Sequence, residues 1–134
     1  MRPLTYVTGI SLTICGIIFA NTPTSAQTAW VAPTSANNLK NPGTCDAAAI
    51  KEAKTIYTST CAPCHGAKGK GDGPAAVALN PKPGDHTSKA IQQESDGSLY
   101  WKLSEGRGAM QAYKTQLSDK QRWELICYIR TLKK

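Results

Sequence analysis

Five consecutive residues could perform chemistry together. Cys61-Ala62-Pro63-Cys64-His65 places two thiols three positions apart and an imidazole directly after the second thiol. At the end of a helix, this spacing lets the thiols add to the two vinyl groups on one edge of a haem, and the imidazole then lies under the iron. The motif therefore predicts covalent haem attachment through Cys61 and Cys64, with His65 as the first axial ligand.

Three other interpretations of these residues are open from sequence alone. A thioredoxin-like dithiol requires a strand–helix context, and no strand pattern precedes the motif. A structural zinc site requires four ligands, and Cys45, His86 and Cys127 are the further candidates. A plain disulfide between Cys61 and Cys64 is the third alternative.

The second axial ligand has few candidates. The chain has two Met, and because Met1 leaves with the signal segment described below, Met110 is the remaining thioether. It lies in a glycine-bounded polar loop at residues 106–111, where a methionine has no evident packing role. A gap-filling Met110 and ligation by His86 are the alternatives. His/Met ligation leaves no open position on iron and favours ferrous iron, which suits electron transfer better than oxygen or peroxide chemistry.

The N-terminal segment has the pattern of an export signal. A positive start is followed by an uncharged apolar run at residues 7–20 and by small residues at 24–26. This predicts a signal peptide over residues 1–26, cleaved before Gln27, and a periplasmic protein. A retained anchor with peripheral membrane association is an alternative, although the run is shorter than the roughly 20 residues that cross a bilayer. A lipid anchor on Cys15 is a further alternative.

The charge balance bears on the type of partner. The formal net charge is +7, or +6 once Arg2 is removed with the signal. A basic surface favours a redox partner with an acidic docking surface or an anionic membrane face. The chain has no Lys/Arg-rich run with interleaved aromatic residues, so we expect no nucleic-acid partner.

The rest of the chain is predicted to be helical with long loops. Residues 27–44 show no period and are interpreted as a linker or extended arm, which leaves 45–134 as one domain. Three segments show helical spacing of apolar residues; they begin near Asp46, Ser95 and Ser118 and end near Ser59, Glu105 and the C-terminus. The intervening loops are long enough to enclose a large ligand, and the glycines of the first one are expected to pass close to it.

Two cysteines lie outside the haem motif. Cys45 precedes the first predicted helix and Cys127 lies in the last one. A disulfide between them requires the two helices to cross with Cα atoms within about 7 Å. A disulfide, two separate buried thiols and an intermolecular bond are all open.

Taken together, these residues resemble class I cytochromes c, in the group of small bacterial periplasmic monohaem cytochromes. The resemblance spans about residues 45–134. The matching pieces occur in family order and are Cys61-Ala62-Pro63-Cys64-His65-Gly66, Lys70-Gly71-Asp72-Gly73-Pro74, Asp96-Gly97-Ser98-Leu99-Tyr100-Trp101-Lys102, Gly106-Arg107-Gly108-Ala109-Met110, Leu117-Ser118, Gln121-Arg122-Trp123 and Tyr128-Ile129-Arg130.

The resemblance implies the all-α cytochrome c fold, with three to five helices and long loops wrapped around one covalently bound haem. The first and last helices are expected to cross. The carbonyl of Pro74 is expected to accept the N–H of His65, and Trp101 and Trp123 are expected to be aromatic packing residues.

The resemblance also implies an electron carrier, or the carrier domain of a respiratory complex. Its partners would be an oxidase, dehydrogenase or reductase, approached through basic residues near the haem edge; the candidates are Lys68, Lys70, Arg107 and Lys114. A haem enzyme or gas sensor with a labile sixth ligand is the first alternative, and a module without haem is the second.

Overall fold

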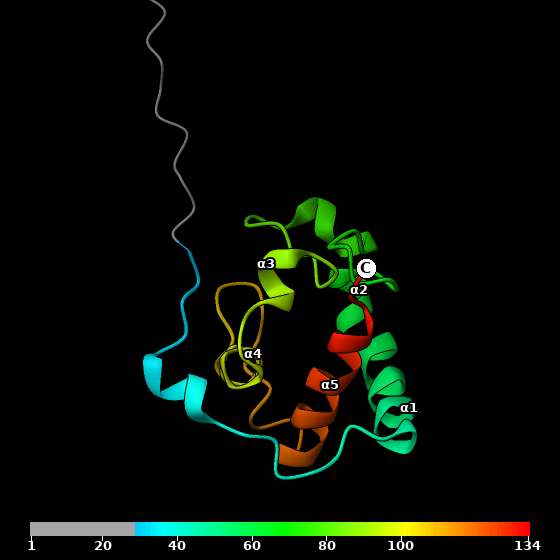
Figure 1. The fold of residues 1–134 in the computed structure, drawn as a ribbon. Helices are drawn as coiled ribbons and strands as arrows, with labels where there is room; N and C mark the ends of the chain where they lie inside the picture. Colours follow the sequence, from blue (N-terminus) through cyan, green and yellow to red (C-terminus); the bar gives the residue numbers. More distant parts are fainter. Residues whose placement is uncertain (1–28) are drawn as a thin grey trace, which may run out of the picture.

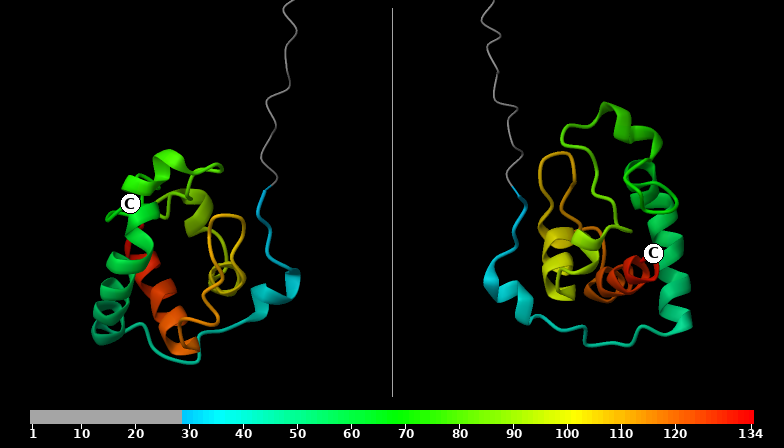
Figure 2. Two further views of the ribbon diagram at one scale, coloured as in Figure 1. Left: turned by 180° about the vertical axis from the view of Figure 1, so that it is seen from behind. Right: turned by 45° about the horizontal axis from the view of Figure 1, so that its top comes forward.

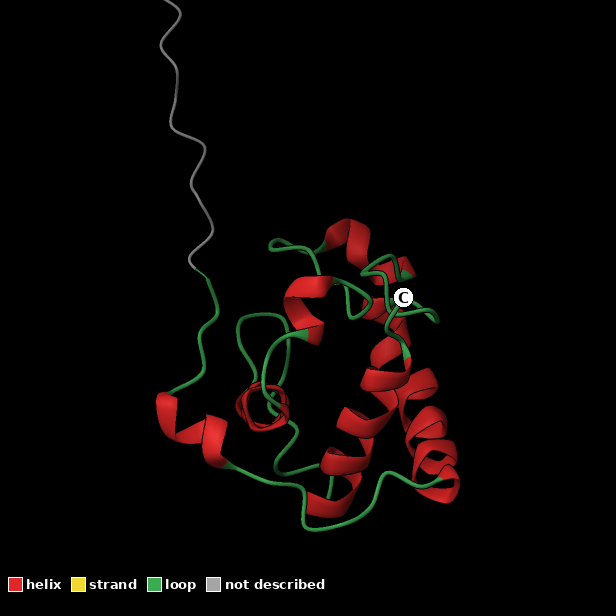
Figure 3. Ribbon diagram, in the orientation of Figure 1, coloured by secondary structure: helices red, strands yellow, loops and turns green. Residues whose placement is uncertain are grey.

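The structure is a computed structural model that describes residues 29–134, and within this range it contains helices and loops but no strand (Figure 3). The predicted signal peptide, residues 1–26, lies outside the described residues. The elements in chain order are the 3₁₀ helix η1 (Thr34–Asn38), α1 (Ala47–Ile56), the π-helical turn η2 (Tyr57–Cys61), α2 (Ala62–His65), the 3₁₀ helix η3 (Pro74–Ala78), α3 (Lys89–Gln92), α4 (Asp96–Glu105) and α5 (Asp119–Thr131).

The first helix is longer than its sequence pattern predicted. Asp46 caps α1, because its carboxylate accepts the N–H groups of Ala48 and Ala49, each at 2.9 Å. We expected the helix to end near Ser59, but it continues through η2 and α2 to His65. Pro63 cannot donate a helical hydrogen bond, and a widened π turn precedes it. The haem motif is therefore the last part of a continuous helical segment.

The last helix confirms its predicted start. Ser118 and Gln121 form a reciprocal capping box at the N-terminus of α5. α5 packs against both α1 and α4, and α1 and α5 lie side by side in every view (Figures 1 and 2). Every residue from Arg122 to Ile129 is buried as a result. The predicted crossing of the first and last helices is thus the centre of the fold.

Aromatic packing differs in part from expectation. Trp123 is buried in the core, as expected, and its ring stacks on that of Tyr100 with centroids 4.1 Å apart. Trp101, the next residue along α4, is half-buried and lies outside the core cluster. Adjacent side chains on a helix point in directions about 100° apart, so Tyr100 and Trp101 cannot both face α5.

A disulfide joins Cys45 to Cys127, with Cα atoms 5.4 Å apart. Of the three alternatives, the intramolecular bond is the one present. Because both sulfur atoms are bonded to each other, neither can serve in the four-ligand zinc site considered above.

The segment interpreted as a linker or extended arm is packed onto the domain where the structure describes it, from residue 29 onward. Residue Ala36 of η1 is 2% exposed, and Ser95 Oγ donates to Asn37 Oδ1 at 2.7 Å. A Cβ atom on Gly97 would lie 2.0 Å from the Ala36 carbonyl oxygen, so the close approach of η1 to α4 requires glycine there. The short helices η1 and α3 were missed because helices of four or five residues show no period.

Within the described part of the chain, no helix combines the length and the apolar character required to cross a bilayer.

The disulfide gives a testable prediction about stability. The double variant Cys45→Ser/Cys127→Ser should lower the free energy of unfolding by about 2–5 kcal/mol, because the bond closes a loop with a sequence separation of 82. Denaturant unfolding of the haem-loaded protein measures this loss. An unchanged unfolding midpoint, with the wild-type disulfide verified by mass, would contradict this stabilising contribution.

Candidate cofactor site

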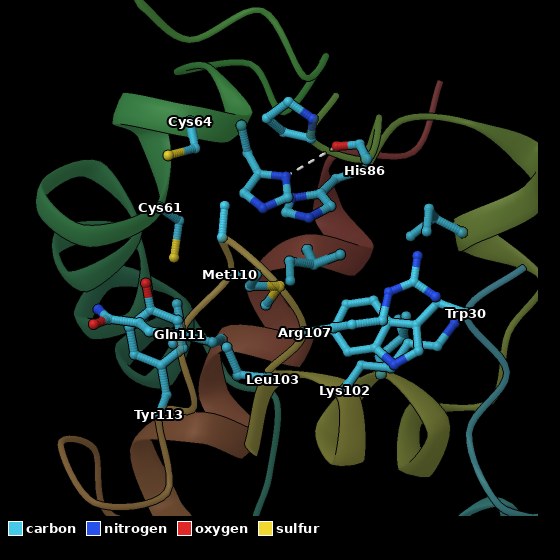
Figure 4. Close-up of a pocket in the computed structure, with 18 of the residues that line it drawn as sticks. Trp30, Cys61, Cys64, His86, Lys102, Leu103, Arg107, Met110, Gln111 and Tyr113 are labelled. Carbon is cyan, nitrogen blue, oxygen red and sulfur yellow. Dashed lines mark hydrogen bonds between the residues drawn. The ribbon is translucent and has the colours of Figure 1, made fainter. Parts of the chain in front are cut away.

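A cavity of about 670 Å³ lies between the end of the first helical segment, the 107–113 loop, α4 and α5 (Figure 4). Its volume is within the range of ligand pockets, roughly 300–1,000 Å³. Much of the lining is aliphatic, from Leu79, Ile91, Leu99, Leu103, Leu125, Ile126 and Ile129. The cavity also receives Cys61, Cys64, His65 and Met110. The fold therefore brings together four of the five predicted site residues; Pro74 is not among the lining residues.

The two motif cysteines are free thiols on the same side of the cavity (Figure 4). The alternative of a disulfide between Cys61 and Cys64 is thus not formed in this structure. Burial, with a smaller contribution from Cys64, raises the pKa of the Cys61 thiol to about 12. Both side chains remain available for bond formation to a group in the cavity.

His65 is oriented by a backbone carbonyl. Its Nδ1–H donates to the Gly84 carbonyl at 2.9 Å, the hydrogen bond drawn dashed in Figure 4. Burial lowers the pKa of His65, and the bond to Gly84 offsets this in part. The ring is therefore neutral near pH 7, and its Nε2 keeps the lone pair that a metal ligand needs.

The acceptor of the His65 N–H is the carbonyl of Gly84 and not, as we had expected, that of Pro74. The backbone just before Pro74 folds onto the motif itself, because the Gly71 N–H donates to the His65 carbonyl at 2.8 Å and the Gly73 N–H to the Cys64 carbonyl at 3.1 Å. Gly84 then lies alongside the imidazole. None of the glycines at residues 66–73 lines the cavity. We expected these glycines to pass close to the ligand, but they contact the backbone of the haem motif instead.

Met110 is presented by a tight turn. The Arg107 N–H donates to the Met110 carbonyl at 2.8 Å, and the Met110 N–H donates to the Arg107 carbonyl at 3.1 Å. Gly106 enters the turn with φ +66°, and a Cβ there would lie 2.5 Å from the Met110 carbonyl oxygen. The chain then returns to α4, where the Tyr113 N–H donates to the Leu103 carbonyl at 3.2 Å. The turn is thus fixed at its base.

His86, the alternative ligand, also reaches the cavity but lies beside His65. The two rings stack with centroids 4.1 Å apart, and the Tyr57 hydroxyl hydrogen-bonds to His86 Nδ1 at 3.0 Å. Burial, together with the nearby His65, lowers the pKa of His86 to about 3. Met110 comes from a different wall of the cavity, on the 107–113 loop.

The sequence did not identify several cavity residues. Gly84 follows Pro83 in the loop that leads to His86, and no local pattern marks it because its contact with His65 is tertiary. Trp30 lines the cavity from the segment interpreted as a linker, and no motif marks it. Of the four basic residues expected near the haem edge, Arg107 lines the cavity, together with the unpredicted Lys82 and Lys102.

These residues fit a haem. The cavity is largely apolar, two unbonded thiols lie on one helical segment, and a neutral imidazole and a thioether line the same space. This is the donor set of a c-type cytochrome.

Comparisons with known proteins agree. The family described as "Cytochrome C oxidase, cbb3-type, subunit III" matches residues 48–129. No relative matches among curated proteins. Among solved structures, the chain is similar to the Kuenenia stuttgartiensis reducing HAO-like protein complex Kustc0457/Kustc0458, with TM-score 0.62, 30% identity, 73% of this chain and 49% of that chain covered. It is also similar in fold to the KustC0563 c-type cytochrome, with TM-score 0.53, 23% identity, 61% of this chain and 98% of that chain covered.

The chain spans about half the length of the first of these two structures. The family match covers more than half of this chain, and the observed all-α fold agrees with the cytochrome c fold. The chain therefore belongs to the family described as cytochrome c oxidase, cbb3-type, subunit III, and it is a class I c-type cytochrome with covalently bound haem c.

Proposed function

We propose that this protein is an electron carrier whose haem is linked to Cys61 and Cys64 and has His65 and Met110 as axial ligands. The observation that carries this proposal is the convergence of these four side chains on one cavity. The bound haem supplies one-electron chemistry at its iron. The residues of this chain would hold the haem, provide the two ligands of its iron and exclude water.

His65 is suited to a fixed bond to iron. Its hydrogen bond to Gly84 sets the ring orientation and leaves Nε2 as the free nitrogen. Such a bond to the second nitrogen also makes an imidazole a better electron donor to a metal.

Met110 is the second residue that would hold the iron. A thioether stabilises ferrous iron relative to a second imidazole, and a filled sixth position blocks exogenous ligands. The reciprocal hydrogen bonds between Arg107 and Met110 limit the movement of the turn. With His65 and Met110 both holding it, the haem would supply one-electron chemistry without a change of ligands.

The apolar lining controls solvent access. Leu99, Leu103 and Leu125 come from α4 and α5, and each is at most 7% exposed. A wall of this kind keeps water from the group, and solvent access is one of the factors that set a haem potential.

The partners we propose are redox proteins with acidic docking surfaces, such as an oxidase, dehydrogenase or reductase. The net charge of +6 that remains without the predicted signal peptide supports this, because complementary charge steers encounter. The structural similarity to a chain of an HAO-like protein complex supports an enzyme as partner. The predicted signal peptide supports export to the periplasm, where donor and acceptor are soluble or membrane-bound redox proteins.

Replacing the methionine tests the axial ligand. Met110→Ala should remove the weak near-infrared sulfur–iron band of the ferric protein, lower the reduction potential and allow rapid CO binding to the ferrous protein. Thr115→Ala, at an exposed position two residues after the 107–113 loop, is the control and should change none of these. Optical titration and CO mixing measure the effects. A Met110→Ala protein with wild-type spectrum and potential would show that another residue binds the iron, and rapid CO binding by the wild type would favour the enzyme or sensor alternative.

Replacing the motif cysteines tests the covalent links. Denatured wild-type protein should retain haem on an electrophoresis gel, whereas the Cys61→Ser/Cys64→Ser protein should lose it, because each thioether bond survives denaturation. The Cys45→Ser/Cys127→Ser protein is the control and should keep its haem, since those sulfurs are joined to each other. Retention of haem by the Cys61→Ser/Cys64→Ser protein would refute the assignment.

A further inference from the structure

We propose that Trp30 closes the cavity beside the Met110 turn and, by holding Arg107, acts as a positioning residue for Met110. This inference rests on the proposed role of Met110 as an iron ligand. It concerns a residue outside the part of the chain, 48–129, that the family match covers.

Trp30 lies against two cations of the cavity rim (Figure 4). The Arg107 guanidinium carbon is 5.1 Å from the centroid of the indole, and the Lys102 Nζ is 5.7 Å from it. Both distances are within the range of cation–π attraction, for which tryptophan is the best aromatic partner. All three side chains line the cavity.

The contact with Arg107 is transmitted to Met110 through the backbone. Arg107 and Met110 face each other across the turn and exchange two hydrogen bonds, at 2.8 and 3.1 Å. A guanidinium held on the indole therefore fixes one side of the turn, while the return of the chain to α4 fixes the other.

Trp30 is itself held in place by the fold. We call residues 29–45 the strap. Its helix η1 is seated on α4 through Ala36, which is 2% exposed, and through the bond from Ser95 Oγ to Asn37 Oδ1. The strap ends at Cys45, which the disulfide ties to α5. The indole therefore belongs to a segment anchored at two points.

Lys102 adds a second constraint. Its ammonium pairs with Glu94 at 2.5 Å, and Glu94 also accepts from Ser98 Oγ at 2.7 Å. Lys102 is 9% exposed as a whole residue. Because Glu94 fixes the ammonium group of Lys102, the position of this cation beside the indole does not depend on the strap.

Loss of the indole should have two measurable consequences. Water enters beside Met110, which favours the more highly charged ferric state and lowers the reduction potential. The turn also loses one support, so the sulfur–iron bond opens more often and an exogenous ligand such as imidazole binds the ferric protein faster.

The experiment compares Trp30→Ala, Trp30→Phe and Val31→Ala in the haem-loaded protein. Trp30→Ala should accelerate imidazole binding about fivefold, a barrier change of about 1 kcal/mol, and should lower the potential. Trp30→Phe should recover most of both effects, because it keeps an aromatic face. Val31 is the adjacent strap residue, 77% exposed, and Val31→Ala should behave as wild type.

A double-mutant cycle tests whether Trp30 acts through Arg107. Arg107→Ala should accelerate imidazole binding in the wild-type background and should do so distinctly less in the Trp30→Ala background. Because Arg107→Ala removes the contact from its other side, the cycle also guards against a Trp30 variant that folds poorly. Fully additive effects, or wild-type rates in Trp30→Ala, would overturn the inference. If the wild-type protein itself lacks the sulfur–iron band, the proposed function fails instead.

Discussion

The packing of α1 against α5 is the constraint on which the site depends. Ala53 and Tyr57 are completely buried in this contact, and the disulfide between Cys45 and Cys127 ties its two partners together. Because the helical segment from Ala47 continues to His65, this packing also fixes the direction in which the haem motif leaves the core. The motif supplies reactive groups, but the helix crossing places them on a cavity wall.

Other parts of the cavity wall come from loops that are held by individual backbone hydrogen bonds. Gly84 accepts the hydrogen bond of His65, and the loop before it folds back onto the motif through Gly71 and Gly73. On the other side, the Met110 turn is closed by Arg107 and returned to α4 at Tyr113. Long loops are therefore compatible with an ordered site here, since each is fixed by specific hydrogen bonds near the cavity.

The sequence predicted those features that are encoded locally. The haem motif and the helix starts near Asp46, Ser95 and Ser118 are short-range patterns, and in the structure these three residues cap α1, α4 and α5. Features set by tertiary contact were not predictable. Nothing in the local sequence distinguishes Gly84 from Pro74 as the acceptor for His65, because the choice depends on how the loop folds back.

The position of the N-terminal segment is also set by tertiary contacts and not by a local sequence pattern. Residues 29–45 have no period, and their order comes from the fit of Ala36 against Gly97 and from the disulfide. Gly97 permits this close approach because it has no Cβ atom, but nothing in the sequence of residues 29–45 indicates it. Trp30 reaches the cavity only because of these distant contacts, so its place in the site required the structure.

The most direct test of the account is the X-ray absorption spectrum at the iron edge of the purified haem-loaded protein, in both oxidation states. The account predicts one sulfur and five nitrogen scatterers around the iron in each state, from Met110, His65 and the porphyrin. A shell of nitrogen atoms without sulfur, or an iron with an open sixth position, would contradict it.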